Sequence, residues 1–159
     1  MNADSSPSSL EGKVAVVTGG SDGIGRMIAE GYLQAGATVY ISSRKANVCD
    51  QVAAELSAVG PCHALPADIA QDDDRAKLVA ALGERTDRLD ILVNNAGIGG
   101  HGTVENTTVA DWDRVMDINA KGVFLGTKSA IPELRRAGGG SIINISSQLG
   151  LVGVDNSSP

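Results

Sequence analysis

Short apolar runs and longer stretches with helical spacing alternate along this chain. The apolar runs have the length of β-strands and lie at residues 14–17, 38–42, 62–66, 90–93 and 141–146. The stretches between them predict helices at residues 26–35, 46–59, 72–86 and 108–136. The last of these is either continuous or in two pieces. The regular alternation predicts an α/β fold, a doubly wound parallel sheet with helices on both faces.

The composition indicates a single domain with a buried sheet. Of the 159 residues, 42% are hydrophobic and only 3% are aromatic, so alanine, valine, leucine and isoleucine must fill the core. Residues 1–10 are polar and rich in serine, and we expect them to form a disordered tail. The folded domain is therefore predicted over residues 11–159.

The charge and the apolar runs restrict the partners. The formal net charge is −6, which gives no support for binding to nucleic acid or to an anionic membrane surface. No apolar run approaches the roughly 18 residues that a membrane span needs. The first residues also lack the basic and then apolar pattern of a signal peptide. We expect a cytoplasmic protein whose partner is a small molecule.

Three glycines separate the first predicted strand from the first predicted helix. Gly19, Gly23 and Gly25 have the spacing Gly-x-x-x-Gly-x-Gly, and no lysine followed by serine or threonine indicates a nucleotide-triphosphate loop. Without side chains at these positions, backbone N–H groups at the helix start can approach a pyrophosphate closely. The strand, turn and helix together predict a nucleotide cradle, with a ligand-free glycine turn as the alternative.

Two motifs resemble one known family. Thr18, Gly19, Gly23, Ile24 and Gly25 resemble the Thr-Gly-x-x-x-Gly-Ile-Gly motif of short-chain dehydrogenases/reductases, and residues 94–97 are similar to that family's Asn-Asn-Ala-Gly motif. The resemblance implies a Rossmann-like domain and an NAD(P)-dependent oxidoreductase that interconverts a ketone and a secondary alcohol by hydride transfer. Within the family the chain is loosely similar to 3-ketoacyl reductases, and sugar or steroid dehydrogenases agree almost as well. The family also implies a homo-oligomer.

The resemblance implies a set of cofactor-binding residues. They are Thr18, Gly19, Ser21, Gly23, Ile24, Gly25, Ser43, Arg44, Asp68, Ile69, Asn95, Ala96 and Gly97. Ser43 and Arg44 stand where an acidic residue would accept hydrogen bonds from the ribose of NAD. Because a guanidinium pairs well with a 2′-phosphate, NADP is favoured over NAD. Asp22 argues the other way, since NADP-preferring members often carry a basic residue there, and Arg44 could instead be a solvated strand-end charge.

Asp68 and Ile69 follow the third predicted strand. The pair resembles the family's Asp-Val or Asp-Ile pair, which contacts adenine. An aspartate that caps the following helix is the alternative interpretation of Asp68. The two roles can coexist.

The resemblance also implies catalytic residues. Asn119 matches the family's helix asparagine, which holds a proton-relay water, and a buried structural amide is its alternative. Ser147 matches the serine that bonds the substrate oxygen. The tyrosine thirteen residues later would fall one position past Pro159, so the C-terminal part of such a domain is expected beyond this chain. We expect the isolated chain to be inactive. A dinucleotide-binding module without catalysis, or a fragment that does not fold, is the alternative.

The remaining residues that could bind a metal or form a disulfide are few. Cys49 and Cys62 are too far apart for a Cys-x-x-Cys motif, and we expect buried or surface thiols, with a disulfide as the less favoured alternative. His63 and His101 lack metal-ligand spacing and are interpreted as structural or solvent-facing. No metal site is predicted.

Overall fold

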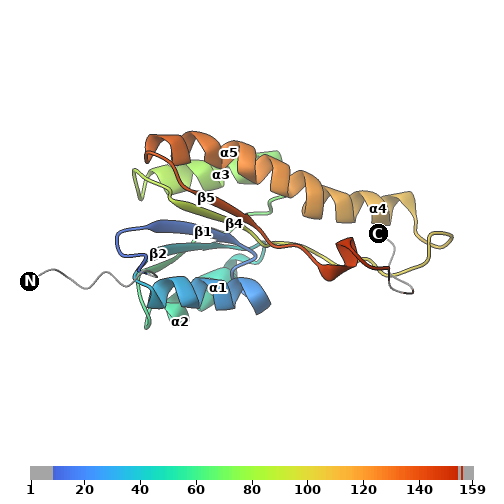
Figure 1. The fold of residues 1–159 in the computed structure, drawn as a ribbon, viewed down its shortest axis with the longest axis horizontal. Helices are drawn as coiled ribbons and strands as arrows, with labels where there is room; N and C mark the ends of the chain where they lie inside the picture. Colours follow the sequence, from blue (N-terminus) through green and yellow to red (C-terminus); the bar gives the residue numbers. More distant parts are fainter. Residues whose placement is uncertain (1–8, 154, 156–159) are drawn as a thin grey trace, which may run out of the picture.

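A computed structural model describes residues 9–153 and residue 155. Five parallel strands form one sheet in the order β3-β2-β1-β4-β5 (Figure 1). The strands are β1 (Val14–Thr18), β2 (Thr38–Ser42), β3 (Cys62–Ala64), β4 (Ile91–Asn94) and β5 (Ser141–Asn144). This arrangement confirms the predicted doubly wound α/β fold.

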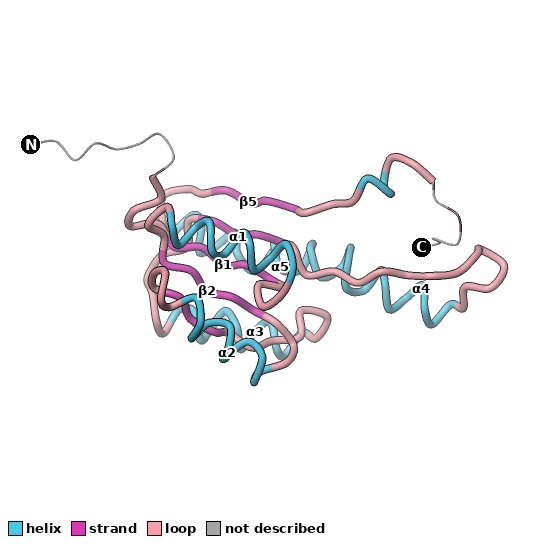
Figure 2. The backbone as a smooth tube through the Cα atoms, turned by 90° about the horizontal axis from the view of Figure 1, so that it is seen from below, coloured by secondary structure: helices cyan, strands magenta, loops and turns pink. Residues whose placement is uncertain are grey.

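Helices cover both faces of the sheet. They are α1 (Gly23–Gln34), α2 (Ala46–Leu56), α3 (Asp72–Gly83), α4 (Val109–Met116) and α5 (Gly122–Arg136). Figure 1 shows α1 and α2 on one face and α3 and α5 on the other. Figure 2 shows β5 along one edge of the sheet, with α4 extending past the ends of the strands.

The alternation of side chains along β1 divides the core in two. Val17 belongs to the cluster packed against α1 and α2, and its neighbour Val16 belongs to the cluster under α3 and α5. Both valines are buried. Because successive side chains of a strand point to opposite faces, an unbroken apolar run is what a strand covered on both sides requires.

The predicted elements all occur, but several end earlier than predicted. The second helix ends at Leu56 because the next turn closes with bonds to the third residue back, such as Val59 N–H to Leu56 O at 2.9 Å. The third strand ends at Ala64, although Leu65 N–H still donates to Ile41 O at 2.9 Å. The third helix ends at Gly83 and the fifth strand at Asn144. The first helix begins at Gly23, three residues earlier than predicted, so Gly23 and Gly25 belong to its first turn.

The predicted helix over residues 108–136 is one helical stretch with a wider turn inside it. Thr108 caps it, its Oγ1 accepting from Asp111 N–H at 3.1 Å, and α4 then leads into a π-helical turn, η1 (Asp117–Lys121), before α5. A single π turn inside an α-helix often marks a functional position. Asn119 lies in this turn.

Of the predicted disordered tail, residues 1–8 lie outside the described part of the chain. Leu10 is described: its N–H donates to Ala35 O at 2.8 Å, and its side chain packs against the core. The predicted boundary of the domain at residue 11 is otherwise untested and stays a prediction.

Asp90 joins the starts of the two central strands. Its Oδ2 accepts from Val14 N–H at 2.9 Å and from Arg88 Nε at 2.8 Å, and its Oδ1 accepts from Lys13 Nζ at 3.2 Å. Burial alone would raise the pKa of this carboxyl, but the hydrogen bonds from Arg88, Val14 and Lys13 outweigh burial and lower it. Asp90 is therefore a buried anion that ties β1 to β4.

The two cysteines are free and buried, which confirms the prediction of thiols rather than a disulfide. Burial is the main cause that raises the pKa of the Cys62 thiol to about 11, so this thiol stays protonated. His63 is exposed and its ring lies 5.0 Å from that of Tyr40. Within the described residues, no cluster of acidic, histidine or cysteine side chains could hold a metal ion, and no helix is long and apolar enough to cross a membrane.

Candidate cofactor cleft

A cleft of about 650 Å³ opens at the carboxyl ends of β1, β2 and β4. The chain leaves β1 toward α1 on one face of the sheet and leaves β4 toward α5 on the other (Figure 1). Ligands of doubly wound sheets bind at such a point, where the connections diverge. Ten predicted cofactor residues line it: Gly19, Ser21, Gly23, Ser43, Arg44, Asp68, Ile69, Asn95, Ala96 and Gly97.

Gly25 allows the start of α1 to pack closely against Gly19 and Asn95 beneath the cleft. A Cβ at this position would lie 2.2 Å from Gly19 O and 2.4 Å from Asn95 Nδ2, closer than real atoms approach. Gly19 has φ of 65°, which favours glycine, and its own Cβ would meet Ala96 Cα at 2.9 Å. The glycine turn therefore packs backbone against backbone with the segment after β4.

Thr18 holds the two loops of the cleft together. Its Oγ1 donates to Val93 O at 3.2 Å and accepts from the N–H groups of Asn95 at 3.0 Å and Ala96 at 3.1 Å. The Asn95 side chain returns a bond to Thr18 O at 3.0 Å. Asn95 and Ala96 are 77 and 78 positions from Thr18 in the sequence, so the two resembling motifs form one structural unit.

Asn94 extends this unit to the edge of the sheet. Its Nδ2 donates to Thr127 Oγ1 on α5 at 3.1 Å and to Asn144 Oδ1 on β5 at 2.8 Å. The side chain is buried, with 4% of its surface exposed, so these bonds replace water around the amide nitrogen. Asn94 thus fixes β4, β5 and α5 relative to one another.

Three predicted cofactor residues do not line the cleft. Thr18 and Gly25 are buried beneath it and shape it. Ile24 lies in the first turn of α1 with 59% of its surface exposed. Asp22 does line it and caps α1, accepting from Gly23 N–H at 2.7 Å.

Cations gather at the end of the cleft beyond β2. Arg44 and Lys45 are exposed there and, within the described residues, have no carboxylate partner. Arg26 also lines the cleft and pairs with Glu55 at 2.9 Å. Ser43 Oγ is buried and has no hydrogen-bond partner among the described residues. Sequence reasoning singled out neither Arg26 nor Lys45, although Lys45 directly follows Arg44.

Asp68 and Ile69 lie next to this cationic end. Ala67 N–H donates to Ser43 O at 3.1 Å, which brings the segment after β3 against the segment after β2. Asp68 Oδ1 accepts from Ala70 N–H at 3.0 Å, whereas the N-cap position of α3 is Gln71, whose side chain makes no capping bond. The helix-capping interpretation of Asp68 is therefore wrong, because its carboxylate closes a local turn instead.

Comparison with known proteins identifies the family. The family model described as short chain dehydrogenase matches residues 13–159. The chain belongs to this family. The match begins one residue before β1 and includes every element described above.

Individual short chain dehydrogenases are similar over most of this chain. The rhamnolipids biosynthesis 3-oxoacyl-[acyl-carrier-protein] reductase of Pseudomonas aeruginosa is 46% identical over 147 residues, which cover 90% of this chain and 57% of the relative. The NADP-dependent (R)-specific alcohol dehydrogenase of Lentilactobacillus kefiri is 38% identical over 145 residues, which cover 91% of this chain and 58% of that relative. The chain thus spans somewhat over half the length of these relatives.

A solved structure agrees with the fold. The Pseudomonas aeruginosa RhlG/NADP active-site complex matches with a TM-score of 0.88 at 44% identity, over 94% of this chain and 60% of that chain. Binding of NAD(P) is a property of the short chain dehydrogenase family.

Neither of the two predicted catalytic residues is among the residues that line the cleft. Asn119 is exposed, not buried: its Oδ1 accepts from Ile98 N–H at 2.9 Å and its Nδ2 donates to Ile98 O at 2.8 Å. Ile98 itself lines the cleft, as does Ile118. Ser147 is exposed, and its Oγ accepts from Leu149 N–H at 3.1 Å at the start of a short 3₁₀ turn, η2 (Gln148–Gly150).

Proposed function

We propose that this chain forms the dinucleotide-binding part of an NADP-preferring oxidoreductase, which interconverts a ketone and a secondary alcohol by hydride transfer. The observation that carries the proposal is the cleft itself, where a glycine turn with no room for a Cβ at Gly19 and Gly25 lies beside cations that have no carboxylate partner among the described residues. A pyrophosphate would lie at the start of α1, between segments that Thr18 holds together. A cleft of this size is sufficient for a nucleotide ligand.

The residues after β2 fit the 2′-phosphate of NADP. Ser43 Oγ is a buried hydroxyl without a partner in the described structure, and such groups cost free energy unless a ligand satisfies them. Arg44 and Lys45 would supply positive charge to the same phosphate. Asp22 also lines the cleft, where its carboxylate accepts from Gly23 N–H at the start of α1, and it remains the residue that argues for NAD. The NADP complex of the similar RhlG structure supports the choice of NADP.

The nicotinamide, when bound, would donate or accept the hydride. Asn119 would fix the segment around Ile98 at that end of the cleft, and a water held on the exposed face of this asparagine would relay a proton. Ser147 would bond the substrate oxygen, because its hydroxyl accepts from Leu149 N–H and keeps its own hydrogen to donate. We assign the role of general acid to a tyrosine that would directly follow Pro159 in a longer polypeptide.

The substrate class proposed is a small carbonyl compound or alcohol. A 3-oxoacyl thioester is favoured, since the relative with that activity shares 46% of the aligned residues. Sugar and steroid substrates are the alternatives that a substrate survey would separate. Homo-oligomerisation and a cytoplasmic location stay predictions.

Titration with NADPH tests the proposal directly. We expect the fluorescence of NADPH to change on binding to the 159-residue chain, with a dissociation constant lower than that for NADH. Binding without turnover in a longer chain that carries the tyrosine and lysine would favour the alternative, a non-catalytic dinucleotide-binding module. No binding at millimolar NADPH by a chain whose circular dichroism shows it folded would overturn the proposal.

A further inference from the structure

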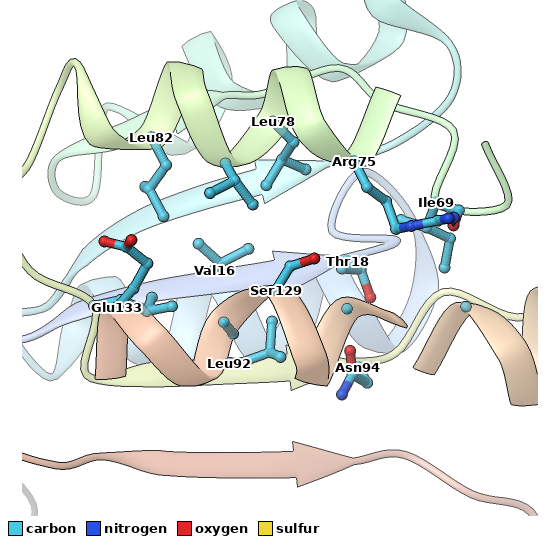
Figure 3. Close-up of a pocket in the computed structure, with 15 residues that line it drawn as sticks. Val16, Thr18, Ile69, Arg75, Leu78, Leu82, Leu92, Asn94, Ser129 and Glu133 are labelled. Atoms are coloured by element: carbon cyan, nitrogen blue, oxygen red, sulfur yellow. Dashed lines mark hydrogen bonds between the residues drawn. The ribbon is translucent and has the colours of Figure 1, made fainter. Parts of the chain in front are cut away.

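Arg75 is an arginine in an apolar setting. It lies in the first half of α3 with 7% of its surface exposed, on the inner face of that helix. Together with Leu78 and Val79 it lines a cavity of about 40 Å³ between α3, α5 and the sheet (Figure 3). Nothing in the sequence pattern or the proposed chemistry uses this side chain.

The guanidinium reaches out of the cavity toward the cofactor cleft. Figure 3 shows the Arg75 side chain running from α3 to Ile69. Its Nη1 donates to Ile69 O, and its Nη2 pairs with the carboxylate of Asp72. Ile69 is one of the two residues after β3 that line the cleft.

The neighbouring residue of α3 holds the other half of the same loop. Asp74 Oδ2 accepts from Asp68 N–H at 3.0 Å, and this bond is the main cause that lowers the pKa of Asp74. One side chain of α3 therefore binds a loop N–H and the next binds a loop carbonyl. Between them lies the peptide bond that joins Asp68 to Ile69.

This double attachment sets where the loop presents its groups to a ligand. Asp68 Oδ1 accepts from Ala70 N–H at 3.0 Å, so its other oxygen is available to an amino group in the cleft. The loop adjoins Ser43 through the bond from Ala67 N–H to Ser43 O. A base attached to a ribose whose 2′-phosphate lies at Ser43 and Arg44 would come against Asp68 and Ile69.

We propose that Arg75 and Asp74 clamp the Asp68–Ile69 loop, and that Arg75 is a positioning residue for recognition of the adenine base. The inference rests on the proposed function for its ligand and on the contacts of Arg75 for its mechanism. An apolar side chain would fill position 75 at no desolvation cost, because a buried ion is often replaced by apolar residues without loss of stability. The guanidinium instead fixes the Ile69 carbonyl. The same peptide unit carries Ala70 N–H, which donates to Asp68 Oδ1 and so orients the Asp68 carboxylate.

Amide exchange on the unliganded chain tests the clamp. We expect Arg75→Met to accelerate exchange at Asp68 and Ala70 by about tenfold, while amides of β1 stay protected. Arg85→Met is the matched control, because Arg85 also donates to a backbone carbonyl, Ala64 O at 3.0 Å, outside this loop. Unchanged exchange at Asp68 and Ala70 in the Arg75→Met chain, or equal acceleration by Arg85→Met, would overturn the clamp. Arg75→Lys, which can reach one acceptor, serves if Arg75→Met does not fold, and it should show a smaller acceleration.

Base discrimination tests the ligand side of the inference. The probes are NADPH and its hypoxanthine analogue, in which a carbonyl replaces the adenine amino group. We expect Arg75→Met to weaken NADPH binding by about threefold to tenfold and the analogue less, so that the preference for adenine falls. A role in stability alone would weaken both equally. Arg44→Ala should also weaken both equally, because both carry the 2′-phosphate.

The two measurements separate failure of the inference from failure of the proposed function. If the wild-type chain binds neither dinucleotide, the proposed function is wrong, and the adenine part of the inference is overturned with it. The exchange result still decides the clamp in that case. If the wild-type chain binds NADPH and Arg75→Met keeps the full adenine preference, only the inference is overturned.

Discussion

At the residue scale, the tightest steric requirement of the cleft falls on Gly25. Its backbone lies against the Gly19 carbonyl and the Asn95 amide, neither of which is the end of a flexible side chain free to move away. Gly31 lies further along the same helix and is exposed, and a methyl group added there would have no neighbour within 4 Å. Substitution by alanine can therefore be compared at a crowded position, Gly25, and at an open one, Gly31, of the same helix.

We expect Gly25→Ala to lower the free energy of unfolding by about 1–3 kcal/mol through overpacking and to abolish NADPH binding. Gly31→Ala should raise it by about 0.5–1 kcal/mol, because alanine is the better helix former. Urea denaturation of both variants checks the stabilities and NADPH fluorescence checks the binding. A Gly25→Ala chain that binds NADPH as tightly as wild type would refute the packing described for the glycine turn.

Arg44 carries the prediction of cofactor choice. Arg44→Ala should weaken NADP(H) binding by about 1.5–3 kcal/mol, the range for hydrogen bonds to charged groups, and leave NAD(H) nearly unchanged. Ser43→Asp should shift the preference toward NAD, because a carboxylate accepts from the ribose hydroxyls and repels the phosphate. Dissociation constants for both cofactors give the measurement. Equal losses for NADP(H) and NAD(H) would show that Arg44 is structural.

At the scale of elements, Asp90 determines how β1 and β4 begin. Asp90→Asn removes the charge that Arg88 and Lys13 pair with, and we expect a loss of about 1.5–3 kcal/mol in the free energy of unfolding. Asp117→Asn breaks only the exposed pair with Lys121 and should cost less than about 0.5 kcal/mol. Chemical denaturation at neutral pH distinguishes the two, and similar small losses would contradict a special role for Asp90.

The same carboxyl gives a pH dependence. Its pKa in the folded chain is lower than the ordinary value of 3.8, so the folded chain binds fewer protons than the unfolded chain. The stability that Asp90 contributes is therefore complete above about pH 5 and is lost as pH falls below 3.8 through the folded pKa. The difference in stability between wild type and Asp90→Asn should narrow over that acidic interval. A difference that stays constant down to the acid limit of folding would refute this assignment.

The π turn connects the long helix to the cleft through Asn119. Asn119→Ala removes both bonds to Ile98, and we expect exchange of the Ile98 amide to become about tenfold faster. Asn119→Asp keeps an oxygen that accepts from Ile98 N–H and should preserve most of the protection. Amide exchange followed by NMR reports both variants. Equal exchange in the alanine and aspartate variants would show that this acceptor is unimportant.

At the scale of the whole molecule, catalysis should depend on residues beyond the 159. Tyr32 lies on α1 and Tyr40 is buried in β2, so neither can donate a proton at Ser147. General acid catalysis contributes about 10²–10⁴-fold, and we expect no measurable NADPH oxidation by the isolated chain with a ketone. A continuation with tyrosine after Pro159 and lysine four residues later should give turnover. The absorbance of NADPH measures the rate for the isolated chain and for the extended chain. Comparable rates would refute the placement of the general acid.

In that longer protein, the two serines after β5 can be compared. Ser147→Ala should reduce kcat more than Ser146→Ala, since only Ser147 has the thirteen-residue spacing to the tyrosine. Rates of ketone reduction by the two variants decide between them. A larger loss from Ser146→Ala would show that the substrate contact belongs to Ser146 instead.

The local pattern of the sequence was enough for the order and type of the elements and for the glycine turn of the cleft, whereas most of the other predicted lining residues followed from the family resemblance. The apolar run at residues 14–17 is typical of a strand covered on both faces, and a glycine cluster between a strand and a helix leaves backbone N–H groups accessible. Such features depend on neighbouring residues alone. Exact element ends were missed because the last turns of helices depend on what packs beside them.

The tertiary structure decided which distant groups meet. The bonds from Thr18 to Asn95 and from Arg75 to the loop at Ile69 form where elements pack against one another, and no period in the sequence reports them. Arg75 was hidden in a polar segment of α3, although its side chain is buried, because the inner face of a helix is chosen by its neighbours. Asp68 likewise closes its own turn rather than capping a helix, since the path of the loop places Ala70 N–H within its reach.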